Sequence, residues 1–172
     1  MDSHILMIMR HAKSDWSSDA AADFERPLSK RGRRNASRMG AWLEEQNVVP
    51  DCIVCSPATR TKMTAQIVCD QLGKKAPGIT WDDRIYEAGI EELLDVISEH
   101  GRYANCLLLI GHNPGLDALL NFLSKEKPQP DDNGKLMTTA AIAVLNYDSS
   151  PISTGRRSAR LAKLMRPKEL SE

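Results

Sequence analysis

Apolar residues along the chain fall into two kinds of pattern, and each kind predicts a type of secondary structure. Short unbroken apolar runs, rich in Ile, Val and Leu, occupy residues 5–9, 52–55 and 106–110. Such runs are typical of strands that are covered on both faces within a parallel sheet. Between them, apolar residues recur at the spacing of amphipathic helices. We therefore predict helices over residues 29–45, 58–72, 90–100 and 115–123.

Residues at the ends of the first two predicted helices support this assignment. Ser29 precedes the first helix, and a hydroxyl side chain at that position caps free backbone amides. Gly73 follows the second helix, where the backbone often turns left-handed. The alternation of strands and helices predicts an α/β fold, a three-layer α/β/α sandwich with a mostly parallel central sheet.

The last third of the chain adds two further strands. Residues 139–147 and 160–165 are strand-like, and turn-forming Ser, Pro, Thr and Gly residues lie between them. We expect these two strands to pair antiparallel at the C-terminal edge of the sheet. Residues 125–133 hold two prolines and several charges, which predicts a surface loop. Residues 74–82 are interpreted as a plain connection after the second helix.

Chain length and charge narrow the classes of function. With 172 residues, the chain fits a single domain over residues 1–172. Its 23 basic and 23 acidic residues give zero net charge, so no global field draws it to nucleic acid or to an anionic membrane. No apolar run approaches the roughly 20 residues of a membrane helix, and the first residues lack the pattern of a signal peptide. We expect a cytoplasmic protein that is a monomer or weak dimer.

The cysteines offer one alternative that the sequence disfavours. Cys52 and Cys55 have the Cys-x-x-Cys spacing found in redox motifs and in zinc sites. A strand over these residues would point the two side chains to opposite faces, and no second pair of ligands lies nearby. We therefore interpret them, together with Cys69 and Cys106, as buried and reduced thiols.

The residues that follow the predicted strands are unusually polar. Arg10 and His11 follow the first strand, Arg60 lies at the helix start after the second, and His112 follows the run 106–110. Parallel strands end at one edge of a sheet, so these side chains should meet beside helix N-termini that favour anions. An arginine fork suits phosphate, and an imidazole with a free nitrogen can attack phosphorus. The sequence predicts a phosphate site in which His11 attacks and His112 stabilises the oxygens in flight.

Other interpretations of the same residues stay open. Each histidine could be a hydrogen-bonded structural residue, and Arg60 could merely neutralise a surface carboxylate. The two histidines could also ligate a metal ion together with Asp15 or Asp117. A metal is disfavoured, because Arg10 and Arg60 would repel a divalent cation and no dense carboxylate cluster accompanies the histidines.

Four ordered motifs cover nearly the whole chain: Met9-Arg10-His11-Ala12-Lys13-Ser14, Pro27-Leu28-Ser29-x-x-Gly32, Ser56-Pro57-x-x-Arg60-x-x-x-Thr64-Ala65 and Gly111-His112-Asn113-Pro114. They resemble the histidine phosphatase superfamily, which has the phosphoglycerate mutase-like fold, and within it the SixA-type phosphohistidine phosphatase branch. The resemblance implies a metal-independent and cofactor-free phosphatase in which His11 becomes phosphorylated. It also implies that Arg10, Arg60 and His112 form the phosphate pocket.

Departures from the superfamily pattern bear on the rim of the expected site. Ala12 replaces the usual glycine, and Lys13 stands where an acidic residue is common, which favours an anionic or phosphorylated surface. The long helical insertion of the mutases is missing after the second helix, which predicts an open and shallow site. A protein substrate could dock across the rim at Lys13 and Ser17. Trp16, beside them, is either exposed for contact or packed under its own loop.

The general acid is less determined by the sequence. Glu87 lies in the region 83–88 that supplies the acid in the wider superfamily, and it could equally be a solvated residue of the following helix. Two basic runs, over residues 30–38 and 156–168, are either solvated surface or guides for a polyanion.

Three functions follow from these residues. The first is removal of phosphate from phosphohistidine in proteins through a phosphorylated His11. The second is a small-molecule or nucleotide phosphomonoesterase of the same superfamily. The third is a non-catalytic phosphate-binding module. The partner is accordingly a phosphorylated protein or a small phosphorylated substrate.

Overall fold

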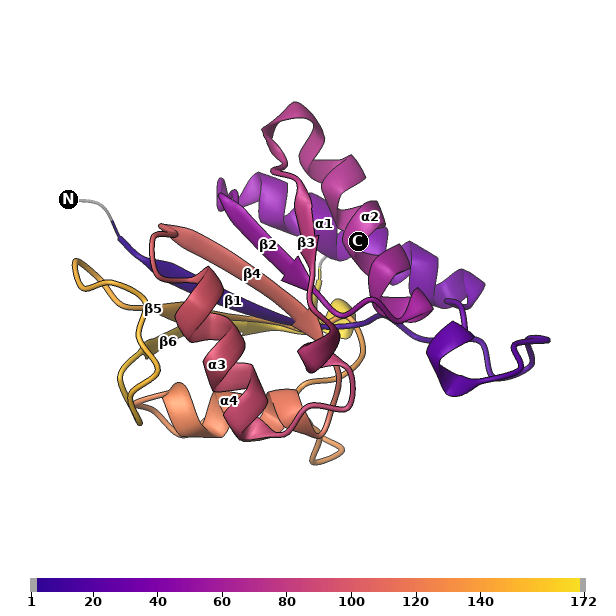
Figure 1. Cartoon of the computed structure of the whole chain (residues 1–172). Helices are drawn as coiled ribbons and strands as arrows, with labels where there is room; N and C mark the ends of the chain where they lie inside the picture. Colours follow the sequence, from indigo (N-terminus) through magenta and orange to yellow (C-terminus); the bar gives the residue numbers. More distant parts are fainter. Residues whose placement is uncertain (1–2, 171–172) are drawn as a thin grey trace.

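The computed structural model describes residues 3–170, which form a mixed α/β structure around one sheet (Figure 1). The strands are β1 (Ile5–Arg10), β2 (Cys52–Cys55), β3 (Ile79–Trp81), β4 (Cys106–Gly111), β5 (Ile142–Asn146) and β6 (Arg160–Met165). The helices are α1 (Lys30–Glu45), α2 (Thr59–Leu72), α3 (Ile90–His100) and α4 (Gly115–Leu123). The 3₁₀ turns are η1 (Asp23–Glu25), η2 (Gly73–Lys75), η3 (Asp83–Ile85) and η4 (Pro167–Glu169).

The sheet has the strand order β3-β2-β4-β1-β5-β6. The first four strands in this order are parallel, whereas β5 is antiparallel to both β1 and β6. The predicted α/β class and the antiparallel C-terminal edge are therefore confirmed. Within residues 3–170, no helix is long and apolar enough to cross a bilayer. The cytoplasmic location stays a prediction.

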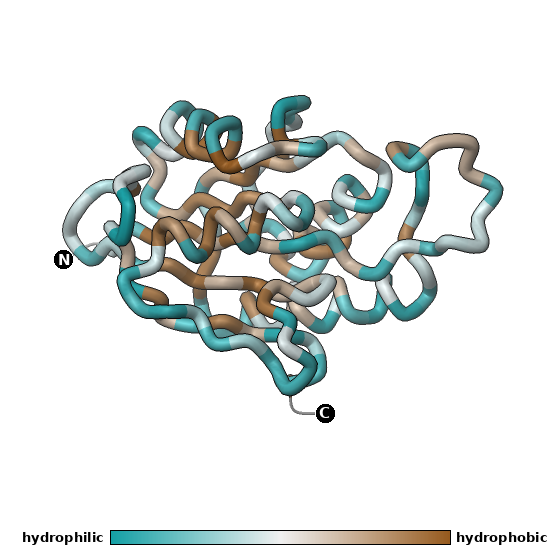
Figure 2. Tube along the Cα trace, turned by 90° about the horizontal axis from the view of Figure 1, so that it is seen from below, coloured by the Kyte–Doolittle hydropathy of each residue, from teal (hydrophilic) through white to brown (hydrophobic). Residues whose placement is uncertain are grey.

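Helices cover both faces of this sheet, which accounts for the apolar strands. Along β1, Leu6 and Ile8 belong to the core cluster under α3 and α4, while Met7 and Met9 belong to the cluster under α1 and α2. Figure 2 shows the result as brown, apolar segments in the interior and teal segments in the outer turns. Because both faces of β1 are buried, its two ends are the parts of the strand that can present polar groups to a ligand.

The cysteines lie on both faces of the sheet. Cys52 packs against the cluster under α3 and α4, whereas Cys55 is buried in the opposite cluster, as predicted for a strand. All four thiols are free. Burial raises the pKa of Cys106 to about 12. Only Cys55 and Cys106 are buried, and Cys52 and Cys69 are half-buried, so the expectation of four buried thiols was too broad.

The segment 74–82 differs from the prediction, because it contains the edge strand β3 as well as the last two residues of η2. Ile79 is half-buried, and the next two residues of β3 are exposed. A strand of three residues with so little buried surface has no apolar run by which a sequence pattern could reveal it. Its pairing with β2 alone defines it.

The first turn of α1 packs directly on the segment that follows β1. The Ser29 hydroxyl accepts a hydrogen bond from the Gly32 amide at 3.0 Å, as expected for a cap, and the Ser29 amide donates to the Lys13 carbonyl at 2.9 Å. A Cβ atom at Gly32 would overlap the Lys13 carbonyl oxygen. Glycine at this position therefore allows the close approach that fixes the backbone beside His11.

We expect Gly32→Ala to lower the free energy of unfolding by about 1–3 kcal/mol, because backbone atoms must move to make room for the methyl group. Gly78→Ala is the matched control, since a Cβ at Gly78 would meet no heavy atom of the described residues within 4 Å. Urea unfolding of both variants measures the difference. Equal stability of the two would show that the contact with Lys13 does not constrain the fold.

Candidate functional site

Side chains from three strand ends meet in one cavity of about 410 Å³. Arg10 ends β1, His11 follows it, Arg60 lies in the first turn of α2, and His112 lies between β4 and α4. The strands that precede them are neighbours in the sheet, so their carboxyl ends lie together. The residues that line the cavity are Arg10, His11, Lys13, Ser14, Trp16, Arg26, Arg60, His112, Asn113, Lys135, Thr138 and Thr139.

His11 is buried and held in one tautomer by its neighbour. Its Nδ1 lies 2.7 Å from the carbonyl oxygen of Ala12, which can only accept a hydrogen bond, so Nδ1 carries the proton. The amide of Ala12 in turn donates to the Thr64 hydroxyl at 3.1 Å. Nε2 of His11 is left unprotonated, and an unprotonated nitrogen is what a nucleophilic imidazole requires.

His112 is the second imidazole, with its ring centroid 5.3 Å from that of His11. Its Nε2 lies 2.8 Å from the Ser56 hydroxyl, which also accepts a hydrogen bond from the Ala58 amide. When the Ser56 hydroxyl donates its proton to Nε2, the ring proton of His112 lies on Nδ1. Nδ1 is buried and has no hydrogen-bond partner among residues 3–170.

Both arginines have part of their guanidinium group engaged and part of it free. Arg10 Nη1 donates to the Met137 carbonyl at 3.0 Å. Arg60 donates from Nη1 to the Asp23 carbonyl at 2.8 Å and from Nη2 to the Asp23 carboxylate at 3.0 Å. In both arginines, Nε is buried without a partner in the described part of the chain. With Nδ1 of His112, the residues lining the cavity hold three buried nitrogen atoms without hydrogen-bond partners among the described residues.

Burial sets the protonation of both histidines. It lowers the pKa of His11 to about 4, and the positive charges of Arg60 and Arg10 act in the same direction against the opposing hydrogen bond to Ala12. Burial likewise lowers the pKa of His112 to about 3, with His11 and Arg60 contributing. Both rings are therefore neutral near neutral pH, and a phosphoryl dianion beside His112 would raise its pKa again.

Asp23 joins the site although sequence reasoning did not select it. Its carboxylate accepts from Arg60, from Arg26 at 2.6 Å and from the Tyr86 hydroxyl at 2.7 Å. The Tyr86 hydroxyl above all, with Arg26 and Arg60, holds the pKa of Asp23 well below its usual range. The only sequence signal was the position of Asp23 and Arg26 just before Pro27, where a recognised motif begins.

The backbone that positions Arg10 is held by a second set of polar contacts. Asn113 donates to the same Met137 carbonyl at 3.0 Å, and the Asp117 carboxylate accepts from the Met137 amide at 3.0 Å. Arg166, which is buried, donates to the Leu136 carbonyl at 2.9 Å. Asp117 therefore supports this loop, and it is not among the residues that line the cavity.

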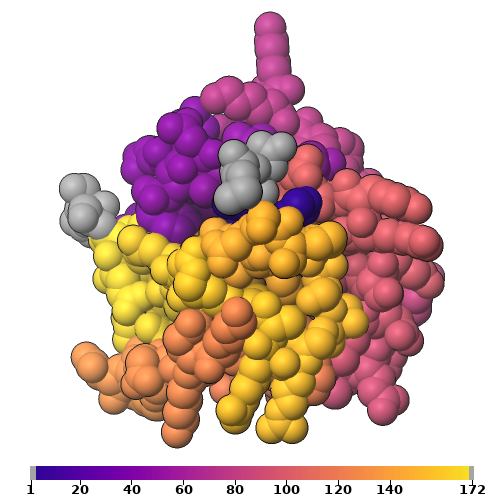
Figure 3. Space-filling view, turned by 90° about the vertical axis from the view of Figure 1, so that its left-hand side faces the viewer, coloured from indigo at the N-terminus to yellow at the C-terminus, as the bar shows by residue number. Residues whose placement is uncertain are grey.

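The second basic run includes structural residues. Arg166 also donates to the Gln129 carbonyl at 2.6 Å, and Lys168 pairs with Asp131 at 2.8 Å. The interpretation of this run as either solvated surface or a guide for polyanions is thus wrong for Arg166. Figure 3 shows the yellow C-terminal segment beside the purple segments that include α1, and η4 contacts α1.

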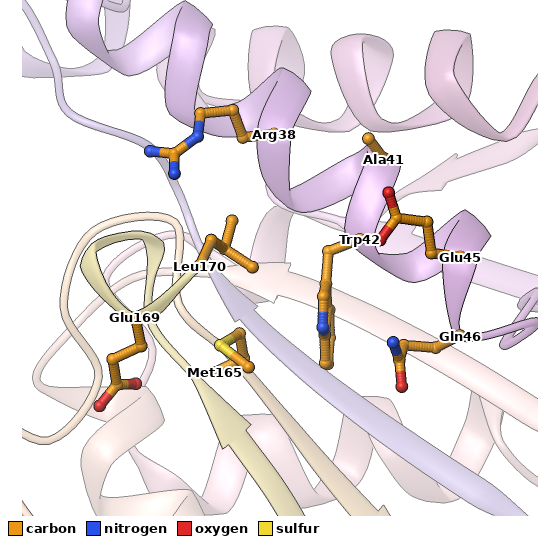
Figure 4. A pocket seen from close by; sticks show the side chains of 8 residues that line it. All are labelled: Arg38, Ala41, Trp42, Glu45, Gln46, Met165, Glu169 and Leu170. Atoms are coloured by element: carbon orange, nitrogen blue, oxygen red, sulfur yellow. The ribbon is translucent and has the colours of Figure 1, made fainter. Parts of the chain in front are cut away.

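No residue of the first basic run, 30–38, lines the cavity that contains His11. Arg38 lines a separate cavity of about 400 Å³ between α1 and the C-terminal segment (Figure 4). Its other charged lining residues are Glu45 and Glu169, and no histidine lines it. A further cluster, of Asp82, Glu99 and His100, is tied together by Arg84, which bonds both carboxylates. Neither the cavity at Arg38 nor the cluster around Asp82 combines an imidazole with unpaired donors.

The remaining predicted residues divide into those at the cavity and those beside it. Lys13 is exposed and lines the cavity. Ser17 does not line it, and its hydroxyl donates to Asp15 at 2.6 Å. Glu87 is exposed and lines an adjoining cavity of about 430 Å³, which shares Arg60 and His112 with the first.

Trp16 resolves the alternative that the sequence left open for it. Its side chain is 78% exposed and lines the cavity, so packing under its own loop is wrong. Lys13, Trp16 and Lys135 at the rim of the cavity are all exposed, which agrees with the expected open site. The wall of the site is the loop of residues 15–26, which Figure 1 shows projecting on the side to which β1 and β4 point.

The comparisons with known proteins define a class, a hydrolase of the phosphatase type. A model of the histidine phosphatase superfamily (branch 1) matches residues 6–93, and the chain belongs to this superfamily, in its SixA-type branch. Phosphohistidine phosphatase SixA of Escherichia coli (strain K12) is 30% identical over 148 residues, which cover 84% of this chain and 86% of SixA.

Two further comparisons are consistent with this assignment. The uncharacterized protein Rv1276c of Mycobacterium tuberculosis (strain ATCC 25618 / H37Rv) is 37% identical over 111 residues, covering 64% of this chain and 66% of that relative. The structure of the protein histidine phosphatase SixA complexed with tungstate has a TM-score of 0.78 at 24% identity, covering 97% of this chain and 99% of that one. The second likeness supports the fold.

We expect the free energy of unfolding to fall as the pH falls from about 6.5 toward 4. In that window the unfolded chain protonates His11 and His112, while the folded protein keeps them neutral down to about 4 and about 3. Each ring adds a slope of up to about 1.4 kcal/mol per pH unit. Urea unfolding at several pH values measures it. His112→Gln should flatten the slope, and an unchanged slope would contradict the neutral state of His112.

Proposed function

We propose that this protein is a phosphatase that removes phosphate from phosphohistidine in proteins through a phosphorylated His11. The observation that carries the proposal is a buried, neutral His11 with an unprotonated Nε2, in a cavity that Arg10, Arg60 and His112 also line. A structural histidine would have its nitrogens satisfied, and a simple anion-binding module would not need a neutral, buried nucleophile.

In the first step, Nε2 of His11 forms a bond to phosphorus while the bond from phosphorus to the leaving nitrogen of the substrate breaks. Arg10 and Arg60 bind the oxygens, and the Nδ1 proton of His112 donates to them as negative charge spreads. The leaving imidazole departs neutral once it is protonated, so it requires less from a protein acid than an alkoxide would. Glu87 is our candidate for supplying that proton.

In the second step, water attacks phosphorus and the bond to Nε2 of His11 breaks. Inorganic phosphate leaves, and the ring returns to its neutral form with the proton on Nδ1. The hydrogen bond from Nδ1 to the Ala12 carbonyl persists through both steps and stabilises the positive ring of the phosphorylated intermediate. The Glu87 carboxylate, which lost its proton in the first step, acts as the general base in the second step and accepts a proton from the attacking water.

Two observations favour phosphohistidine in a protein as the substrate: the open rim of the site and the similarity to SixA. The SixA relative bears the name of a phosphohistidine phosphatase. In this chain His11 and Arg60 are buried and Arg10 and His112 are half-buried, while Lys13, Trp16 and Lys135 at the rim are exposed. A small phosphate ester that fits the inner groups would contact little else, and a protein would gain binding energy from the rim.

The deciding experiment traps the phosphorylated enzyme and compares substrates. Histidine-phosphorylated proteins are assayed against sugar phosphates, nucleotides and p-nitrophenyl phosphate. We expect an acid-labile phosphoryl group on His11 and a higher kcat/KM for phosphohistidine proteins. A high kcat/KM for one ester, with phosphohistidine untouched, would establish a small-molecule phosphatase instead. Phosphate binding without turnover of any substrate would establish a binding module.

His11→Ala should abolish both turnover and phosphoenzyme formation, because no other group supplies the attacking nitrogen. The matched control is His100→Ala, which removes an imidazole outside the cavity. Circular dichroism and urea unfolding verify that both variants fold. A phosphoenzyme in His11→Ala would place the nucleophile elsewhere.

Turnover should also survive a strong chelator, because Arg10, Arg60 and His112 supply the charge stabilisation in this mechanism. The measurement is kcat before and after prolonged dialysis against EDTA in metal-free buffer. Inhibition that an added divalent cation reverses would overturn the metal-independent mechanism.

A further inference from the structure

Trp16 is a large apolar side chain placed in the open beside the inner phosphate-binding groups. It is 78% exposed and lines the same cavity as His11. Burying an aromatic side chain is strongly favourable, so a partner that covered the exposed indole of Trp16 would gain binding free energy. Trp and Arg are also the residues that most often dominate the binding energy of protein interfaces.

The contacts beneath Trp16 hold its ring in a fixed orientation. The Arg26 guanidinium stacks on it, 3.6 Å from the ring centroid. Arg26 is itself fixed, because its Nε donates to Ser14 at 2.9 Å and its Nη1 pairs with Asp23. Asp23 is bound to Arg60. The exposed indole is therefore preorganised by a continuous set of contacts that ends at a phosphate-binding residue, and little side-chain entropy remains to be lost on binding.

The charged side chains that line the cavity are all basic, although the whole chain has zero net charge. Its lining includes five cationic side chains, those of Arg10, Lys13, Arg26, Arg60 and Lys135. Within residues 3–170, no Asp or Glu lines this cavity. The acidic residues of the neighbouring loop, Asp15, Asp19, Asp23 and Glu25, lie outside the lining, and Asp23 pairs with Arg26 and Arg60. Lys13 and Lys135 form no ion pair in the described part of the chain. These two cations exceed what Arg10 and Arg60 already offer to one phosphoryl group.

We propose that Trp16, Lys13 and Lys135 form a docking surface for a phosphorylated protein that carries acidic and apolar side chains beside its phosphohistidine. The acidic side chains pair with Lys13 and Lys135, and an apolar side chain covers the open face of Trp16. Charge complementarity selects such a partner over a basic one. This inference rests on the proposed function and adds which flanking residues the substrate presents.

The test uses two synthetic peptides that each carry one phosphohistidine, flanked by Asp and Leu in the first and by Lys and Leu in the second. Phosphoimidazole serves as the reference substrate. We expect kcat/KM for the acidic peptide to exceed that for the basic peptide by at least about tenfold at low salt, and the preference to shrink as salt is raised.

Variants then assign the preference to the rim. Trp16→Ala should lower the ratio of kcat/KM for the acidic peptide to that for phosphoimidazole by about thirtyfold, the lower end of the scale for an interface hot spot. The double variant Lys13→Ala/Lys135→Ala should remove most of the preference for acidic flanks. Tyr103→Ala is the matched control, because Tyr103 is 86% exposed, lies under Arg102 and is not in the cavity lining.

The possible outcomes separate the two proposals. Equal kcat/KM for both peptides, or an unchanged ratio in Trp16→Ala, would overturn the docking surface while leaving a phosphohistidine phosphatase. Failure to hydrolyse phosphoimidazole and both peptides, with turnover of phosphate esters, would overturn the proposed function itself. Sedimentation of the wild type and Trp16→Ala tests a second copy as occupant: a dimer that this substitution dissociates, with the peptide preference intact, would overturn the docking proposal.

Discussion

The hydrogen-bonded pairing of β1 with β4 sets the geometry on which the whole site depends. The register places Arg10 opposite Gly111, and the ladder continues past the end of β1, from the His11 amide to the Gly111 carbonyl. On the other side of β4, the pairing with β2 continues from the Ser56 amide to the Ile110 carbonyl. These bonds bring His11, Ser56 and His112 to one point. A slip of one residue would turn every side chain of β1 to the other face of the sheet and take Arg10 out of the cavity.

Burial at that point has opposite effects on the groups gathered there. It keeps both imidazoles neutral, which suits nucleophilic attack by His11, and it leaves cationic donors without partners. The protein tolerates these donors because other atoms of each guanidinium group are engaged, at Met137 for Arg10 and at Asp23 for Arg60. The site is thus stable as folded and remains complementary to an anion.

The loop of residues 15–26 joins the rim of the site to its phosphate-binding groups. Asp23 reaches from this loop to Arg60 and Tyr86, so one carboxylate fixes a phosphate-binding arginine and joins the loop to η3. Trp16 lies at the other end of the same loop, on Arg26. The rim and the inner groups are therefore parts of one set of contacts.

The sequence by itself determined the main strands and helices and the antiparallel edge, because local patterns of apolar and turn residues suffice for these. It also determined that Arg10, His11, Arg60 and His112 approach one another, because parallel strands end at one edge of a sheet. The tertiary structure alone decided β3, the engagement of Asp23, the burial of Arg166 and the exposure of Trp16. Each of these depends on contacts between residues far apart in the chain, and no local periodicity records which distant carbonyl, carboxylate or guanidinium group a polar side chain will meet.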